Sequence, residues 1–212
     1  GQFPGAAPGV ISWNDLDLTT SIRARGVRVA DGLVCANVDH LDIHEKSGAT
    51  FHNLTGRVRV GKEKVIVNNL VIDEEFSYLN LRTFKMLGPL KDYNEIFDKI
   101  RFEGDFRSPS HLSMKTISRF APGMDNLTMD AKIVGKDAGY VSDFVFDDFR
   151  FEDLTSGLTA TLRGDFIGLP YIEDSHFNIN VTNLIFETKT LEKFVTEWAP
   201  ETKIGLGGIA KG

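Results

Sequence analysis

The stretch VIVNNLVI, residues 65–72, decides the fold class of this chain. Its apolar side chains stand at Val65, Val67, Leu70 and Ile72, with two asparagines between the halves. Within each half every second residue is apolar, which is typical of a β-strand because successive side chains point to opposite faces. The step of three from Val67 to Leu70 would move the second half to the other face. Both halves share one apolar face only if the strand bends or bulges at the polar pair.

The same eight-residue pattern, apolar–x–apolar–polar–polar–apolar–x–apolar, occurs five times. Its copies are residues 11–18, 36–43, 65–72, 144–151 and 179–186. The central pair is mostly Asn and Asp, which tolerate unusual backbone angles and bond to the nearby backbone. Each copy therefore predicts a strand, a corner and a strand. The spacing between copies is irregular, which argues against a fixed-period solenoid. The pattern fits a sheet folded over lengthwise and an ordinary sandwich with bulged strands equally well.

Other segments complete a mainly β prediction. Alternation also predicts strands at residues 57–60, 132–134, 158–162 and 177–181. Apolar residues three or four apart predict three short helices, at residues 89–100, 113–121 and 191–198. We expect these helices to pack on the sheet or plug it. The predicted organisation is a flexible lead-in at residues 1–10, one domain at residues 11–200 and a flexible tail at residues 201–212.

Composition excludes some classes of function. The chain has 212 residues and a net charge of −6, without the basic stripe that a nucleic-acid partner would require. The single cysteine, Cys35, lies in an apolar run and is expected to be a small core residue. No stretch approaches the roughly 20 apolar residues of a membrane-spanning helix, and no secretory signal is present.

The sequence does not carry a motif of a known catalytic site. It has no Gly-x-Ser-x-Gly elbow, no phosphate-binding glycine loop and no His-Glu-x-x-His. The strongest metal candidate is His40, Asp42 and His44 with His52, but these residues fit a solvated strand face better. We therefore predict no metal, no cofactor and no enzymatic activity.

Two acidic pairs are candidates for general acid and base. These are Asp147-Asp148 and Glu74-Glu75. Adjacent strand residues point to opposite faces, which argues against a shared catalytic site in either pair. For the first pair, the corner of the eight-residue pattern is the better interpretation.

Three stretches resemble the AsmA/TamB family of bacterial envelope proteins, in the portion upstream of the C-terminal TamB domain. They are residues 68–86 (NNLVIDEEFSYLNLRTFKM), 107–135 (RSPSHLSMKTISRFAPGMDNLTMDAKIVG) and 158–187 (LTATLRGDFIGLPYIEDSHFNINVTNLIFE). The resemblance implies an elongated, folded-over antiparallel sheet that forms a groove, in a periplasmic protein anchored to the inner membrane. It also implies transport of phospholipid to the outer membrane or assistance in its assembly, with outer-membrane assembly proteins as partners.

On this hypothesis alternate apolar residues line a groove for phospholipid acyl chains. The predicted lining is Val65, Val67, Leu70, Ile72, Phe144, Phe146, Phe149, Phe151, Ile179, Val181, Leu184 and Phe186. The same residues, among them many of the 16 phenylalanines, would equally form an ordinary closed core. The alternative function is therefore a non-enzymatic β-scaffold or interaction domain in envelope assembly.

Overall fold

The computed structural model describes residues 10–186 except 13–14, 90, 92–94, 121–128, 169–175 and the side chain of Phe97. Within this part the chain is mainly β. The strands are β1 (Leu18–Ala30), β2 (Leu33–Glu45), β3 (Thr50–Val60), β4 (Lys64–Glu74), β5 (Tyr78–Leu87), β6 (Arg101–Phe106), β7 (His111–Ser113), β8 (Asp130–Tyr140), β9 (Asp143–Asp153), β10 (Thr159–Ile167) and β11 (His176–Ile185). The predicted strands at residues 57–60, 132–134, 158–162 and 177–181 are all confirmed.

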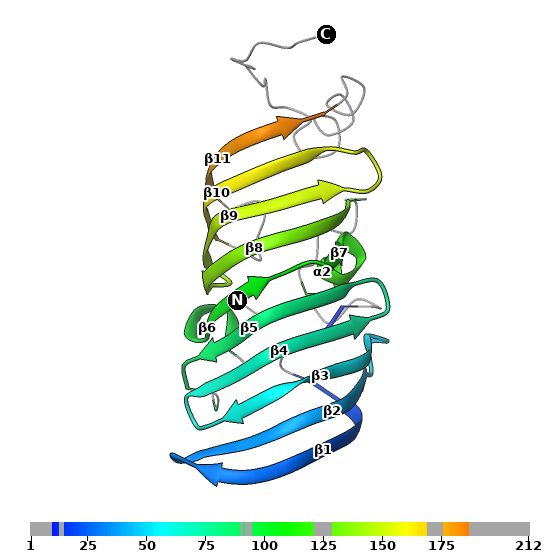
Figure 1. Cartoon of the computed structure of the whole chain (residues 1–212), viewed down its shortest axis with the longest axis vertical. Helices are drawn as coiled ribbons and strands as arrows, with labels where there is room; N and C mark the ends of the chain where they lie inside the picture. Colours follow the sequence, from blue (N-terminus) through cyan, green and yellow to red (C-terminus); the bar gives the residue numbers. More distant parts are fainter. Residues whose placement is uncertain are drawn as a thin grey trace.

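All strands belong to one antiparallel sheet that follows chain order from β1 to β11 (Figure 1). Two short strands, β6 and β7, both lie between β5 and β8. The pairing of β6 covers Leu81–Leu87 of β5, whereas β7 pairs with Tyr78 at the start of the same strand. Both short strands also pair with β8, so these four strands form a closed ring of pairings, β5–β6–β8–β7–β5. Within it, β6 and β7 lie one after the other between the two longer strands β5 and β8.

The predicted corners are confirmed at three copies of the eight-residue pattern. Asn69, Asp148 and Asn183, each the second residue of a polar pair, have φ angles of 52°, 48° and 51°. The register shifts at each position, so that two residues of the bulged strand face one residue of the neighbouring strand. In β4 these two residues face Gly56 of β3. A left-handed residue and a bulge are the physical means by which both halves keep one face.

The other two copies behave differently. Residues 36–43 lie in β2, where the register with β1 shifts at Asp39 without a left-handed residue. In the copy at residues 11–18, the described residues 11–12 and 15–17 are not in a strand, and β1 begins at Leu18. Instead, Ile11 is buried and its N–H donates to the carbonyl of Arg119, 2.8 Å away. Ile11 of this copy therefore contacts α2 and does not extend the sheet.

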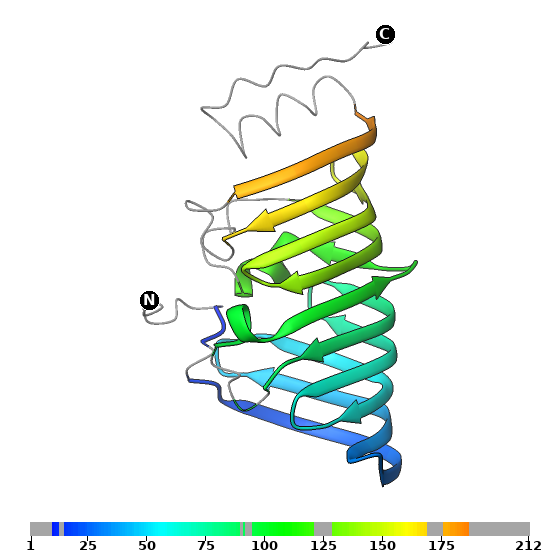
Figure 2. The ribbon, with the colours of Figure 1, turned by 90° about the vertical axis from the view of Figure 1, so that its left-hand side faces the viewer.

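Two short helices accompany the sheet: α1 (Ile96–Lys99) and α2 (Met114–Phe120). The helix predicted at residues 113–121 is confirmed as α2, and that at residues 89–100 is shortened to α1 in the described part. The third predicted helix, residues 191–198, lies outside the described residues, as do the predicted tail (201–212) and all but the last residue of the predicted lead-in (1–10). Seen edge-on, the strands curve along their length, and α2 lies on one side of the sheet (Figure 2). None of the described helices has the length and apolar content needed to cross a membrane.

Candidate functional site: the apolar face of the sheet

One face of the sheet collects the apolar side chains, and we call it the apolar face. Strand register defines it, because residues that pair directly across antiparallel strands point to the same side. One cross-strand row runs through Val58, Val67, Phe84, Gly104, Asp137, Phe146, Gly164 and Ile179. Apart from two glycines and one aspartate, every member of this row is apolar.

The predicted lining residues of β4 and β9 come together on this face. In the first cluster, Val67, Leu70 and Leu81 are buried, and Val65 and Ile72 pack against them. Both halves of the β4 pattern are therefore on one side, as the corner requires.

The second cluster repeats this arrangement on β8 and β9. Ala131, Ile133 and Phe149 are buried, and Phe146 and Phe151 pack against them. Leu79 and Phe106 pack against both clusters, which makes the two clusters one continuous apolar layer.

Phenylalanine rings extend this layer across several strands. Phe106, Phe149, Phe146, Phe166 and Phe177 form a chain of ring contacts from β6 to β11, which we call the phenylalanine stripe. Successive centroids are 6.0, 5.1, 5.7 and 5.7 Å apart. These are the usual separations of packed aromatic pairs. Phe144 joins it through Phe146, at 4.9 Å.

Three stripe members, Phe106, Phe166 and Phe177, are absent from the predicted lining. Phe177 lies in the predicted strand at residues 177–181, where it alternates with Ile179 and Val181 and so could have been assigned to the same face. Phe106 and Phe166 lie outside the five copies, and only strand pairing reveals that they join the stripe.

The predicted lining residues of β11 lie at the margin of the apolar face. Ile179 and Val181 pair with Gly164 and Leu162 of β10, but Val181 and Leu184 are exposed. Phe186 follows the last residue of β11 and lies outside the strand. These residues are therefore contiguous with the layer, but they are not part of either buried cluster.

At both ends of the sheet the apolar face is open to solvent. Phe177 on β11 is 69% exposed, and Ile22 and Val29 on β1 are 62% and 76% exposed. Ile22 and Val29 pair with Leu41 and Val34, which places them on the apolar side. Large exposed apolar patches on proteins are common at contact sites for lipids or other proteins.

The carboxyl group of Asp137 interrupts the apolar cross-strand row. Asp137 of β8 pairs with Gly104 on one side and Phe146 on the other. Its Oδ1 atom is buried and has no hydrogen-bond partner among the described residues. Burial raises the pKa of Asp137 to about 7, and hydrogen bonds from the backbone of Asp137 and Gly104 oppose this rise only in part.

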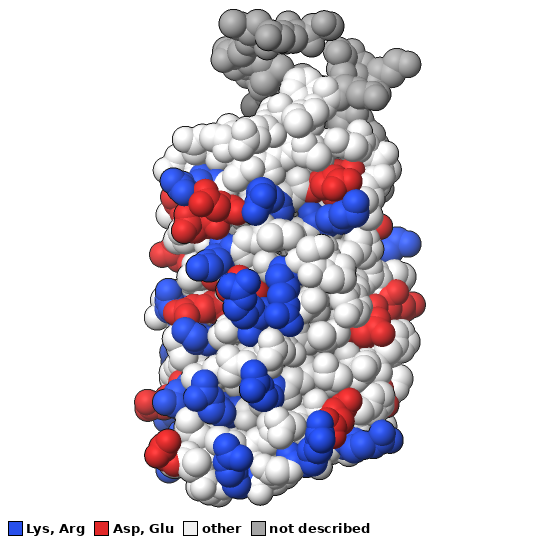
Figure 3. Space-filling view, viewed as in Figure 1, with Lys and Arg blue, Asp and Glu red and all other residues white. Residues whose placement is uncertain are grey.

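The opposite face is charged. Lys, Arg, Asp and Glu side chains are spread among other residues on the side of the sheet turned to the viewer in Figure 3. Many are paired across strands, such as Lys85 with Glu103 at 2.7 Å and Lys132 with Glu152 at 3.0 Å. The sheet is thus amphipathic, with one apolar and one ionic face.

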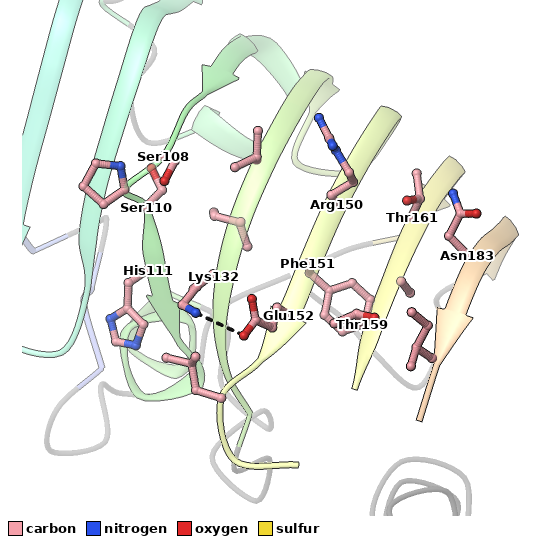
Figure 4. A pocket seen from close by; sticks show the side chains of 16 residues that line it. Ser108, Ser110, His111, Lys132, Arg150, Phe151, Glu152, Thr159, Thr161 and Asn183 are labelled. Atoms are coloured by element: carbon pink, nitrogen blue, oxygen red, sulfur yellow. Dashed lines mark hydrogen bonds and ion pairs between the residues drawn. The ribbon is translucent and has the colours of Figure 1, made fainter. Parts of the chain in front are cut away.

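A shallow hollow of about 700 Å³ lies on this charged face, over β7 to β11 (Figure 4). Its lining includes hydroxyl groups and one histidine, and two of these side chains are held by other contacts. The Ser110 hydroxyl donates to the carbonyl of Arg107 at 2.7 Å, and His111 forms an ion pair with Asp130. No pair of nucleophile and base is formed in this hollow by the residues that the structure describes.

The histidine candidate is explained by local hydrogen bonds. His40 contacts Asn53 Oδ1 at 2.9 Å through Nδ1 and Asp42 Oδ2 at 2.8 Å through Nε2. His44 lies 3.4 Å from the hydroxyl of Thr50. In the described part of the chain, His, Cys, Asp and Glu side chains do not gather in any group of three or more that could hold a metal.

The prediction that Asp147 and Asp148 point to opposite faces is wrong. Both carboxylates reach Arg163 of β10, at 3.2 Å from Nε and 2.7 Å from Nη2. The left-handed backbone of Asp148 turns the second side chain back to the side of the first. The pair is the corner of β9, as predicted, and it also binds a neighbouring strand.

Buried carboxylates at the ends of β2, β4 and β9 are a feature that the sequence prediction missed. Glu45, Glu74 and Asp153 each stand two residues after a copy of the pattern and are buried. Each accepts a hydrogen bond from a backbone N–H of the following turn, at 2.7 to 2.9 Å. The sequence signal that could have revealed them is an acidic residue two positions after a copy of the eight-residue pattern.

Glu74 also fastens α2 to the sheet. The Thr116 hydroxyl donates to Glu74 Oε2 at 2.6 Å and lies 2.6 Å from the hydroxyl of Ser77. Arg119, at the other end of α2, binds Glu75 at 2.5 Å and lies over the ring of Phe76. This buried network holds α2 against the β4–β5 turn.

Comparisons with known proteins add no assignment to this geometry. No family model matches the chain, and no curated protein or solved structure matches it either.

Proposed function

We propose that this chain is a segment of an AsmA/TamB-like envelope protein whose apolar face forms a groove for phospholipid acyl chains. In this proposal it acts in the periplasm, in phospholipid transport to the outer membrane or in outer-membrane assembly, and performs no catalysis. The observation that carries the proposal is the continuous apolar layer, which runs across strands and remains solvent-exposed at both ends of the sheet.

The shape and chemistry of this layer suit acyl chains. The phenylalanine stripe runs across strands, so an acyl chain aligned with it would contact several strands in succession. Each methylene buried there contributes about 0.8 kcal/mol without any specific polar contact. The curvature of the strands supports a groove on the side where α2 lies (Figure 2). The resemblance of residues 68–86, 107–135 and 158–187 to AsmA/TamB proteins supports the same function.

A second candidate function is a scaffold with a closed core. It is favoured by the burial of Phe149, which is only 9% exposed, and of Val67 and Leu70. Residues this buried contribute to folding whether or not a lipid binds. The two functions therefore differ in what the half-buried and exposed members of the apolar face do.

Charge substitution at two adjacent residues separates these functions. Phe146 is a half-buried member of the stripe, whereas Val145 is 47% exposed on the opposite face of the same strand. Vesicles of phosphatidylethanolamine and phosphatidylglycerol would be mixed with the purified chain, and bound lipid would be counted by native mass spectrometry. We expect lipid on the wild type and on Val145→Asp, and loss of lipid from Phe146→Asp.

Ile22→Asp provides a second variant at a position where unfolding is not expected, because this side chain is mostly exposed. Its matched control is Ser21→Asp on the other face of β1. A wild-type chain that binds no phospholipid would overturn the groove proposal and leave the scaffold. Equal lipid binding by Ile22→Asp, Ser21→Asp and the wild type would also count against it.

A further inference from the structure

The two edge strands of the sheet differ in how they are protected from pairing with other strands. An exposed edge strand is a template for another strand unless charges, bulges or prolines block it. β1 carries Arg23, Arg25 and Arg28, and its register breaks at Gly26, which has a φ of 63°. β11, HFNINVTNLI, has no Lys, Arg, Asp or Glu and no proline or glycine. Among the strands that the structure describes, β1 is therefore a protected edge and β11 an unprotected one.

The outer edge of β11 is regular as well as uncharged. Its register with β10 is unbroken from His176 to Thr182 and shifts only beyond that point. None of the strands in the described part of the chain pairs with this outer edge. Seven consecutive residues therefore present an even row of backbone groups.

This row is self-complementary. If two copies of β11 pair antiparallel about Ile179, this residue faces itself and Phe177 faces Val181. In the same register Asn178 faces Asn180 and His176 faces Thr182. Every apolar residue then meets an apolar residue and every polar residue meets a polar one, with no charged group in any pair.

The symmetry also preserves the apolar face. A two-fold axis perpendicular to the sheet relates the two antiparallel strands without exchanging their faces. Phe177, Ile179 and Val181 of both copies would then lie on the same side, and their exposed surface would be shared. The phenylalanine stripes of the two copies would meet at the joint.

We propose that a second copy of this chain adds to the outer edge of β11, giving a symmetric dimer with one continuous sheet. The contact consists of residues 176–182 paired about Ile179. This inference does not depend on lipid binding, because it rests on the sequence and register of one edge.

The register can be tested with single cysteines. Directly opposed residues in antiparallel strands have Cα atoms about 4.5 to 5.5 Å apart, within the range of a disulfide. Ile179→Cys places two thiols opposite each other, whereas Val181→Cys on the same strand and face places a thiol opposite Phe177. The native Cys35 is buried and is present in every variant, so the wild type controls for any disulfide that it forms. Under mild oxidation we expect a covalent dimer from Ile179→Cys and none from Val181→Cys or the wild type.

Charge substitution tests the edge itself. Asn178→Lys with Asn180→Lys would place lysines opposite each other across the joint, at exposed positions that the fold does not require. Thr19→Lys with Ser21→Lys adds the same charge to exposed positions of β1. By light scattering we expect a mass of twice the 23.6 kDa chain mass for the wild type and the β1 variant. For the β11 variant we expect this mass to be halved, to that of one chain.

Two results would overturn this proposal. One is a wild-type chain that stays monomeric up to the highest soluble concentration. The other is a dimer that survives the β11 charges or is dissociated by the β1 charges. Because lipid is absent from these measurements, they succeed or fail separately from the groove proposal.

Discussion

The carboxyl group of Asp137 lies directly over the α-carbon of Gly104, on the apolar side of the sheet. A β-carbon added to Gly104 would collide with this carboxyl and would lie 2.9 Å from the ring of Phe106. Gly104 therefore makes room for a polar group that has no charged partner among the described residues. An acid in this position is tolerated most easily in its neutral form.

The stability of the protein should consequently depend on Asp137 near neutral pH. Its pKa is raised from 3.8 to about 7 in the folded chain, so folding favours the protonated form. The unfolding free energy contributed by this group falls as pH rises from about 4 to about 7 and is constant above. The pKa difference between the unfolded and the folded chain corresponds to a change of about 4 kcal/mol in the unfolding free energy.

Asp137→Asn should remove this dependence. We expect urea unfolding to show equal stability of variant and wild type near pH 4, and a more stable variant by up to about 4 kcal/mol at pH 8. The pKa values of Glu45 and Glu103 are lowered, so acid destabilises both proteins alike below about pH 4.5. Asp143→Asn, at an exposed residue of β9, should follow the wild type throughout. A constant difference across the pH range would contradict this account.

At the corner of β4, a β-branched residue in place of Asn69 should destabilise the fold, whereas glycine should not. Asn69 has a φ of 52°, a conformation that costs a β-branched residue about 1 to 2 kcal/mol. Asn69→Val should therefore lower the unfolding free energy by at least this amount, and Asn69→Gly should leave it nearly unchanged. Asn68→Val, one residue earlier, is the matched control because its φ is not positive. Similar losses from both valines would show that the corner is not the cause.

The bulge in β9 requires glycine on the strand beside it. A β-carbon on Gly135 would lie 2.6 Å from the α-carbon of Phe149, and the φ of Gly135 is 147°. We expect Gly135→Ala to cost about 1 to 3 kcal/mol in thermal or urea unfolding. Gly157→Ala also has a positive φ, but nothing lies within 4 Å of the added carbon. The excess loss at Gly135 over Gly157 measures the close approach of β8 to the bulge.

Thr116 should control how firmly α2 is held. Its hydroxyl lies between Glu74 and Ser77, and Thr116→Val leaves the Glu74 carboxylate with one bond fewer in a buried place. We expect a loss of about 1 to 3 kcal/mol and faster hydrogen exchange of the α2 amides. Ser118→Ala, on the exposed side of the same helix, should change neither quantity. Unaltered exchange in Thr116→Val would indicate that other contacts hold the helix.

The eight-residue pattern was sufficient to predict strands, corners and a common apolar side, because these properties follow from local backbone geometry. Asn69, Asp148 and Asn183 adopt the left-handed conformation at the predicted positions. The failure at residues 11–18 has a tertiary cause, since Ile11 is bound by α2 instead of a strand. The shared contact of Asp147 and Asp148 with Arg163 also depends on a neighbouring strand, and adjacent residues alone do not reveal it.

The candidate site was predictable only in part for the same reason. Val65, Val67, Phe146 and Phe149 follow from alternation within one strand. The phenylalanine stripe crosses strands, so its path through Phe106, Phe166 and Phe177 depends on register between segments far apart in sequence. Asp137 was missed because its consequence arises from burial against Gly104 and not from any motif.

The order of the strands has a consequence for how such a chain can change its length. Because the strands follow chain order and are all antiparallel, with β6 and β7 sharing one position, the two edge strands run in opposite directions. Removing or inserting one strand would reverse the direction of every strand that follows. Removing or inserting a hairpin leaves all later directions, and the side on which each apolar residue lies, unchanged. The hairpin is thus the smallest unit by which this architecture can be lengthened or shortened in evolution or by engineering, without redesign of the remaining sheet.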